Sequence, residues 1–249
     1  PIQVTTGLAT PSTPAHDSDL DGDGFTYAQE AGYGSDPNSN SSIPGLDFGL
    51  VAYYPFDGNA SDMSGNDNHG TPYNGVASGQ DRHGIAGKAF AFDGINDYVE
   101  VPYSSDVNSL NFSFSIWVRT GVLNSRIESP ITSRGPQTGF MLYKWSDNVW
   151  RTQVGHGTWW GSVIGNAAIA SNWEHFIFTH SDGNCSLFQN GLLHGSSTIN
   201  VVQNSAYPLR FGTGKTEDSP TFFFNGSIDE VRIYDRALSA AEIQALYDL

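Results

Sequence analysis

Residues 110–119 read LNFSFSIWVR, with apolar side chains at every second position. Successive side chains of a β-strand point to opposite faces, so this period predicts a strand with one apolar and one wetter face. The two faces would carry, in turn, Leu110, Phe112, Phe114, Ile116 and Val118, and then Asn111, Ser113, Ser115, Trp117 and Arg119. The regularity of the strand favours a packing role for its tryptophan.

Similar runs recur along the chain, at GLVAYYPF, KAFAFDG, DYVEVP, GFMLYKW, NVWRTQV, WEHFIFTH, CSLFQ, LLHGSS, PLRFGTG and IDEVRIYD. Between two of them, Asn190-Gly191 predicts a hairpin turn, because both residues tolerate a positive φ. The 28 glycines, 13% aromatic residues and only 15% charged residues also favour short strands joined by tight turns. We therefore expect an all-β chain, folded as a two-sheet antiparallel sandwich.

Only the C-terminal stretch has helical spacing. Ser239 and Glu242 form a capping box, the sequence signature of a helix N-terminus. Ile243, Leu246 and Tyr247 then follow at the spacing of one helix face. We expect one short helix here that caps the sandwich.

Composition divides the chain into four segments. Residues 1–16 are rich in Pro and Thr, which is typical of a linker to a preceding domain. Residues 17–38 form an acidic loop segment, and residues 39–46 read as a second short linker. Residues 47–249 then form the large domain.

Charge and hydropathy limit the partners of this chain. A formal charge of −15 with only 11 Lys and Arg argues against nucleic acid, and suits cations or neutral ligands better. There is no long apolar run, so we expect no membrane span. A first residue Pro1 and no signal peptide indicate a mature or excised piece of a larger protein. Cys185 has no second cysteine to pair with and is expected to be buried.

The sharpest motif is DLDGDGFTYAQE at residues 19–30. It fits DxDxDGxxxxxE, the twelve-residue calcium loop, in which oxygens surround a hard cation. The predicted Ca²⁺ ligands are Asp19, Asp21, Asp23, the carbonyl of Phe25, and Glu30. A Pro-rich flank in place of a preceding helix favours structural stabilisation over signalling. The alternative is an acidic linker that binds no metal.

Several stretches carry a family resemblance: GLVAYYPFDGNASDMSGNDNHGT, KAFAFDGINDYVEVP, FSFSIWVRT, WEHFIFTH, LFQNGLLHG and FNGSIDEVRIYDRALSAAEIQALY. From residue 46 to the C-terminus the chain resembles the bacterial laminin G-like, concanavalin A-like jelly-roll family. The resemblance implies two packed antiparallel sheets and an appended carbohydrate-binding, adhesion or partner-binding module. With its GSDPN, the segment 17–38 resembles a bacterial thrombospondin type 3 repeat and its EF-hand-like calcium loop, although Tyr27 departs from that pattern.

The laminin G-like resemblance also implies a second Ca²⁺ site at the final strand. In a regular strand Asp229 would share a face with Val231 and Ile233, and an inward carboxylate needs compensation. The remaining ligands would come from the N-terminal loop, namely Asp57, Asn59 and Asp62. The alternative is a set of hydrogen-bonded turn carboxylates.

Two stretches combine flat aromatic rings with polar groups, as sugar binding requires. They are YKWSDNVWR at 143–151 and HGTWWG at 156–161. The candidate ligand-binding residues are Trp145, Trp150, Arg151, His156, Trp159 and Trp160. The last two would face opposite sides of an extended chain, so one of them is a candidate stacking platform. The alternative for each ring is a place in the core.

No catalytic pattern stands out in the sequence. No Glu is followed two residues later by Asp, as in the ExDxxE of jelly-roll glucanases, and HExxH is absent. Glu174 and His175 are strand neighbours that point apart.

We expect a non-catalytic, calcium-stabilised carbohydrate-binding module of a larger secreted or cell-surface bacterial protein. Its partners would be a polysaccharide and other domains of the same polypeptide. One alternative is an adhesion or protein-interaction module. The other is a glycoside hydrolase or polysaccharide lyase.

Overall fold

The computed structural model describes residues 18–20, 25–33, 35–39 and 45–249. They form two compact units. The smaller unit takes the described residues up to Phe48 together with 239–241, and the larger unit takes Gly49–Leu238 and Glu242–Leu249. Within the described ranges, no helix is long and apolar enough to cross a membrane.

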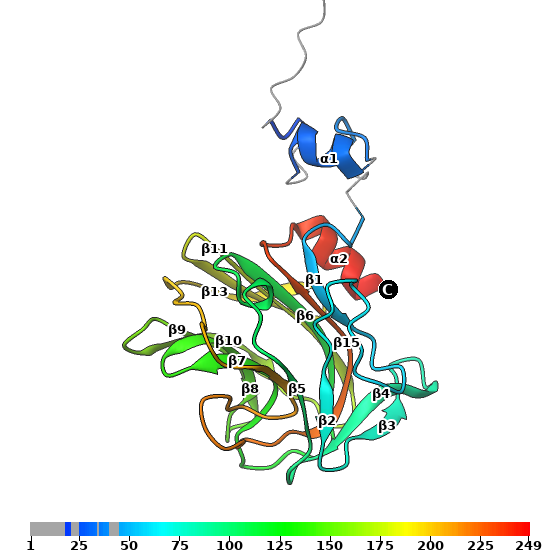
Figure 1. Ribbon diagram of the computed structural model, residues 1–249, viewed down its shortest axis with the longest axis vertical. Coiled ribbons are helices and arrows are strands. Elements are labelled where there is room, and N and C mark those ends of the chain that lie inside the picture. The colour runs from blue at the N-terminus through cyan, green and yellow to red at the C-terminus, as the bar shows by residue number, and fades with distance from the viewer. Residues whose placement is uncertain (1–17, 21–24, 34, 40–44) are drawn as a thin grey trace, which may run out of the picture. The chain divides into compact units, whose positions relative to one another are not determined.

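The larger unit is built from two antiparallel sheets (Figure 1). The seven-stranded sheet runs, in spatial order, β10 (Trp160–Ala167), β9 (Val149–Gly155), β8 (Thr138–Lys144), β7 (Glu128–Gly135), β14 (Leu209–Phe211), β5 (Tyr98–Val101) and β2 (Thr71–Tyr73). The eight-stranded sheet runs β13 (Leu192–Thr198), β12 (Asn184–Gln189), β11 (Trp173–Ser181), β6 (Phe112–Thr120), β15 (Asn225–Tyr234), β4 (Ala86–Asp93) and β3 (Ala77–Gln80), while β1 (Leu50–Tyr54) also pairs with β15. The predicted two-sheet antiparallel sandwich is confirmed.

The alternating strand β6 lies near the middle of the eight-stranded sheet, between β11 and β15. Its apolar side chains from Phe112 to Val118 are all buried between the two sheets. Phe114, for example, stacks on Phe140 of the opposite sheet with ring centroids 5.2 Å apart. Leu110 departs from the prediction: it precedes the strand and is 52% exposed. The hairpin at Asn190-Gly191 is confirmed, with positive φ at both residues.

Strand β7 lacks a period of two because both of its faces are covered. All eight of its residues are buried. The segment 212–222 runs along its outer side, where the Phe222 carbonyl accepts a hydrogen bond from the Ser129 N–H at 2.9 Å. The Thr216 hydroxyl accepts from the Arg134 N–H at 3.1 Å. A strand buried on both faces has no reason to alternate, so the sequence analysis did not find it.

Strand β15 contains a bulge that reverses one predicted face. Asp229 lies opposite Trp117, whereas Arg232 lies opposite Ser115, and Glu230 between them has a φ of 51°. The extra residue moves Asp229 to the outer face of the sheet, while Val231 and Ile233 stay in the core. The prediction that these three residues share a face is therefore wrong.

The predicted C-terminal helix is α2 (Ala240–Asp248), which begins directly after Ser239. Glu242 accepts a hydrogen bond from Arg236 Nη1 at 2.8 Å. The ring of Tyr247 stacks on Trp117, so this helix lies against the outer face of the eight-stranded sheet (Figure 1). A short 3₁₀ helix, Asp106–Asn108, precedes β6.

The smaller unit contains α1 (Tyr27–Tyr33). Thr26 and Gln29 form a capping box at its start: the Thr26 N–H donates to Gln29 Oε1 at 2.8 Å, and the Gln29 N–H donates to Thr26 Oγ1 at 3.4 Å. Phe25 is buried and meets the ring of Phe48 edge-on at 6.0 Å.

Candidate functional site

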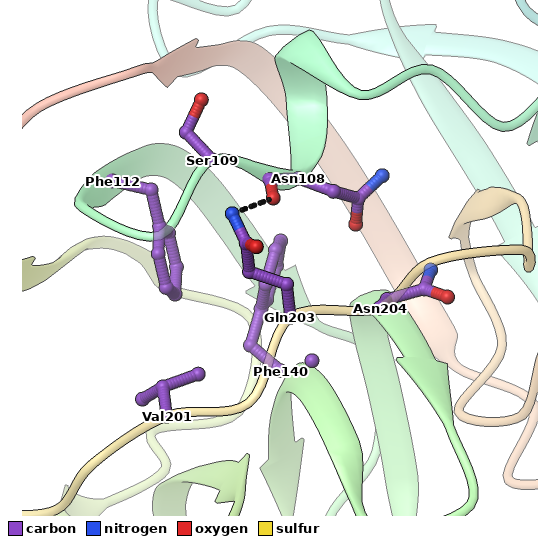
Figure 2. Close-up of a pocket in the computed structure, with 8 residues that line it drawn as sticks. Asn108, Ser109, Phe112, Phe140, Val201, Gln203 and Asn204 are labelled. Carbon is purple, nitrogen blue, oxygen red and sulfur yellow. Dashed lines mark hydrogen bonds between the residues drawn. The ribbon is translucent and has the colours of Figure 1, made fainter.

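One cavity lies between the two sheets at the start of β6 and β8 (Figure 2). The Gln203 side chain donates to the Asn108 carbonyl at 2.9 Å beside the rings of Phe112 and Phe140. The cavity volume is about 10 Å³, which is room for about one water molecule. A sugar cannot enter this cavity, and the sequence-predicted aromatic residues lie elsewhere.

The outer face of the seven-stranded sheet carries three of the sequence-predicted residues. Trp145 follows β8 at the position that continues the outward face of Tyr143. Arg151 pairs with Tyr143 across β8 and β9, and Trp160 pairs with Gly155 across β9 and β10. Between these two rows the register brings together Met141, Gln153 and Ser162. The result is a floor of the buried Met141 and the polar Gln153 and Ser162, with aromatic rings at both ends.

At one end of this face, the guanidinium of Arg134 of β7 lies over the ring of Trp160, with its Cζ 4.3 Å from the ring centroid. Two strands separate them, and the residues opposite them in the register are Gly139 and Gly155. The long Arg134 side chain reaches across both strands to the ring. Glu217 of the segment 212–222 holds the other side of Arg134, with 2.6 Å between Nη2 and Oε1. Neither Arg134 nor Glu217 has a local sequence signal, so the sequence analysis missed both.

At the other end, the rings of Tyr143 and Trp145 meet edge-on at 5.8 Å. Trp145 is 42% exposed. Arg151 Nη2 lies 2.7 Å from the carboxylate of Asp147, and this hydrogen bond holds the pKa of Asp147 below its ordinary value. Burial raises the pKa of Tyr143, so its hydroxyl stays protonated and can donate a hydrogen bond. Along β9, Arg151 and Gly155, the residue opposite Trp160, are four residues apart, which corresponds to about 13 Å. The outer face between them is therefore longer than one sugar ring.

Trp150 is a correction to the predicted site. Its ring is 0% exposed and packs on Phe176 in the core. The indole N–H donates to Glu174 Oε2 at 3.2 Å, and Gln189 donates to the other oxygen of that carboxylate at 2.7 Å. Burial raises the pKa of Glu174. Trp150 faces inward because it alternates with the outward Arg151, so it cannot contact a polysaccharide.

Trp159 and His156 lie apart from Trp160. Trp159 is 48% exposed, and His156 stacks on it with ring centroids 4.9 Å apart. Its ring edge approaches Gly161 and Ile199, on the core-facing side of β10. The two adjacent tryptophans therefore point to opposite sides, as expected for an extended chain, and only Trp160 shares the outer face with Arg151.

Three carboxylates of this sheet and of the segment 212–222 pair with arginines. Glu217 pairs with Arg134, Asp147 with Arg151, and Glu100 with Arg210, the last at 2.7 Å. A pair of carboxylates that face each other across an open groove, as glycoside hydrolysis requires, is not found among these residues.

A protein-family sequence pattern described as the concanavalin A-like lectin/glucanases superfamily, in its Laminin_G_3 branch, matches residues 93–244. That is more than half of the 249-residue chain. The chain belongs to the concanavalin A-like lectin/glucanase superfamily.

Solved structures of similar fold include sugar complexes. Domain 4 of AbnA, a GH43 extracellular arabinanase from Geobacillus stearothermophilus, in complex with arabinotriose, is 25% identical with a TM-score of 0.66, over 80% of this chain and 98% of that one. The binding domain of paraclostridial mosquitocidal protein 1 is 22% identical (TM-score 0.67, 81% of this chain, 52% of that chain). The binding domain of botulinum neurotoxin DC, in complex with SialylT, is 17% identical (TM-score 0.66, 81% and 52%). The chain thus spans about half the length of these two toxin domains. No curated protein matches the chain in sequence.

In this lectin/glucanase domain, the residues predicted for a second Ca²⁺ site do not converge on one ion. Asp62 accepts hydrogen bonds from the N–H groups of Tyr53, Ser64 and Asn68 at 2.8–3.0 Å, which occupies both of its oxygens. Asn59 Oδ1 accepts from the Ser61 N–H at 2.8 Å. These contacts organise the loop after β1.

The other two members of that predicted set have cationic side chains beside them. Asp57 lies 2.5 Å from Lys88 Nζ, and Asp229 lies 3.4 Å from Arg82 Nη1. Burial and the neighbouring Glu230 raise the pKa of Asp229 to about 7, against the opposite effect of Arg82. In the described ranges, no three carboxylate, imidazole or thiol groups lie close enough to hold one metal. The bulge in β15 turns Asp229 toward Arg82, and a Ca²⁺ site formed by Asp229 with Asp57, Asn59 and Asp62 stays a prediction.

The structure describes only part of the predicted calcium loop at residues 19–30. Asp21 and Asp23 lie outside the described residues. Asp19 is exposed, whereas Phe25 and Glu30 are buried, and Glu30 is on α1. A buried carboxylate needs a cation or hydrogen-bond donors beside it, so Glu30 fits the predicted role of closing a Ca²⁺ shell.

Proposed function

We propose that this chain is a non-catalytic carbohydrate-binding domain that holds a polysaccharide on the outer face of its seven-stranded sheet. The observation that carries the proposal is the row from the exposed Trp145 to the partly exposed Trp160, with the polar side chains of Arg151, Gln153 and Ser162 between the two rings. Sugars present apolar C–H faces and hydroxyl edges, so they need flat rings and directional polar groups on one surface. Arg151 and Gln153 supply such groups between the rings.

The comparisons support the same class of ligand. The arabinanase domain whose title names arabinotriose is covered over almost its whole length by this chain. Its parent enzyme is extracellular by its printed name. We extend both properties to this chain: a glycan ligand, and a place in a larger secreted or cell-surface protein.

Binding without hydrolysis is favoured because Glu217, Asp147 and Glu100 are each paired with an arginine. A general acid needs a raised pKa, and ion pairing has the opposite effect on a carboxyl group. An adhesion module that contacts proteins is the second candidate, favoured by the exposed Leu192 and Leu193 on the edge strand β13.

The test is affinity electrophoresis against a panel of polysaccharides that begins with arabinan. Trp160→Ala and Trp145→Ala should each weaken binding by at least about tenfold, the loss of one well-buried anchor ring. Trp159→Ala is the matched control: it removes the same ring from the adjacent residue, whose side chain lies on the other side, and should leave the affinity within about twofold.

Thermal unfolding separates these effects from misfolding, since Trp145 is largely exposed and its removal should leave the melting temperature unchanged. Equal losses in the Trp159 and Trp160 variants, or no retention of the native chain on any polymer, would overturn the proposal. Product assays on the bound polymers test the absence of hydrolysis.

We also propose that the segment 19–30 binds Ca²⁺ for structural stabilisation. The pattern of Asp19 and Glu30 with the intervening carboxylates supports it, together with the burial of Glu30. Ca²⁺ would supply charge compensation for these clustered carboxylates.

A further inference from the structure

A second set of aromatic rings lies on the opposite sheet, away from the proposed glycan site. The outer face of the eight-stranded sheet contains a hollow of about 430 Å³, lined by Trp117, Trp173, Tyr247, Arg82 and His83 among others. Trp117 of β6 and Trp173 of β11 are both partly exposed. This volume falls within the range of small-ligand pockets, about 300–1,000 Å³. The sequence analysis assigned Trp117 to packing, and Tyr247 does stack on it.

A second hollow of about 290 Å³ continues along the same face. It is lined by Arg119, Thr120, Ser171, Asn225 and Ser227. Trp117 and Arg119 are two residues apart on one face of β6, so the hollows are neighbours. The guanidinium of Arg119 also stacks over the ring of Trp173, 5.2 Å from its centroid. We call the two hollows together the Trp173–Asn225 groove.

Arg119 differs from the arginine at the other end of this groove. Arg82 has the carboxylate of Asp229 at 3.4 Å. Arg119 donates one hydrogen bond, to the Ser227 hydroxyl at 3.1 Å, and no carboxylate pairs with it in the part of the chain that the structure describes. Since a guanidinium has five N–H donors, Arg119 keeps donors for a ligand. Hydroxyl and amide groups of Ser171 and Asn225 lie in the same hollow.

We propose that the Trp173–Asn225 groove is a second glycan-binding site that takes a segment of an uncharged oligosaccharide. Trp173 would stack against a sugar ring, and Arg119 would donate to its hydroxyl or ring oxygens. A polyanion is disfavoured as the occupant because the net charge of −15 repels it. The inference rests on the proposed function for the class of ligand only. With one site on each sheet, a single domain can hold two polysaccharide chains.

The two sites can be followed separately by the indole N–H signals of an ¹⁵N-labelled protein, assigned with single Trp→Phe variants. Neutral oligosaccharides, beginning with arabinotriose, are titrated into the native chain. We expect the Trp160 and Trp173 signals to move with different midpoints. Arg119→Gln should weaken the Trp173 response about ten- to a hundredfold, the contribution of a charge-assisted hydrogen bond, and leave the Trp160 response unchanged.

Arg126→Gln is the matched control. Arg126 also lacks a carboxylate partner among the described residues, donates to the Gly94 carbonyl at 3.3 Å, and lines neither hollow. Arg119→Lys keeps the positive charge and should keep part of the affinity measured at Trp173, which would show that the variants of this position still fold. A Trp173 signal that stays fixed while Trp160 saturates overturns the second site alone. A response at Trp173 without one at Trp160 supports the groove and overturns the first site, and no response at either tryptophan overturns both.

Discussion

At the scale of single residues, His175 is the buried group whose charge state has the largest consequence. Its Nε2 lies 2.8 Å from the Ser115 hydroxyl, and its ring stacks on Trp117 at 4.7 Å and on Tyr247 at 6.0 Å. Burial, helped by Arg82 and Arg232, lowers the pKa of His175 to about 3. The folded protein therefore keeps this imidazole neutral at any ordinary pH.

The consequence is a loss of stability in acid. The unfolded chain binds a proton at His175 near pH 6.5, so the contribution of this residue is complete above pH 6.5 and falls as pH drops toward 3. By pH 4.5 the loss is roughly 2–3 kcal/mol. Asp229, with its pKa raised to about 7, acts in the opposite direction over the same range, because the folded state holds its proton more tightly.

The contribution of His175 can be isolated by comparing the free energies of unfolding of the native protein and a His175→Phe variant at two pH values. His175→Phe should lower the free energy of unfolding at pH 8 by about 1–3 kcal/mol, because the Ser115 hydroxyl loses its partner. The gap to the native protein should then narrow by roughly 2–3 kcal/mol at pH 4.5, as measured by urea unfolding. His194→Phe, at an exposed position of β13, is the control and should show no such narrowing. A constant gap would mean that His175 is protonated in the fold.

At the scale of elements, the segment 212–222 is held on β7 by backbone hydrogen bonds and by a few side-chain contacts. One of these contacts is the ion pair of Arg134 and Glu217, whose side chains are both largely buried. The guanidinium of the same arginine lies over the ring of Trp160. The position of this segment therefore determines the geometry of one end of the proposed glycan site.

Removing the Glu217 charge should loosen both the segment 212–222 and the position of Arg134 over Trp160. Glu217→Gln is expected to lower stability by about 1–3 kcal/mol, because a partly buried guanidinium loses its charged partner. Amide exchange should accelerate in residues 213–222, and glycan affinity should fall. The control is Lys215→Gln, which breaks the exposed pair of Lys215 and Asp218 in the same segment and should cost under about 1 kcal/mol. Equal effects from the two variants would contradict the tethering role of Glu217.

At the scale of the whole molecule, the two compact units should respond differently to removal of Ca²⁺. The acidic motif belongs to the smaller unit, whereas Asp57, Asp229 and Asp62 of the larger unit have a lysine, an arginine and backbone N–H groups as partners. A chelator should therefore expose residues 17–38 to protease and leave the near-ultraviolet circular dichroism of the sandwich unchanged. Glu30→Gln should reproduce the effect of the chelator, and Asp57→Asn should not. Unchanged cleavage with chelator would exclude the calcium loop.

The sequence by itself determined the features that depend on neighbours along the chain. The alternation in Phe112–Thr120, the turn at Asn190-Gly191 and the helix after Ser239 are each set by local side-chain direction, φ preference or capping. These signals were enough for the fold class. They also placed Trp145, Arg151 and Trp160 in one candidate set.

Only the tertiary structure decided which faces are covered and which residues meet. Trp150 is in the core. Asp229 is turned outward by a bulge that the sequence pattern does not predict. Arg134, Trp160 and Glu217 converge from three distant parts of the chain, as Arg119, Trp173 and Asn225 do on the opposite sheet. Alternation gives the two sides of a strand. Which side stays open to a ligand depends on long-range packing, and local sequence does not encode it.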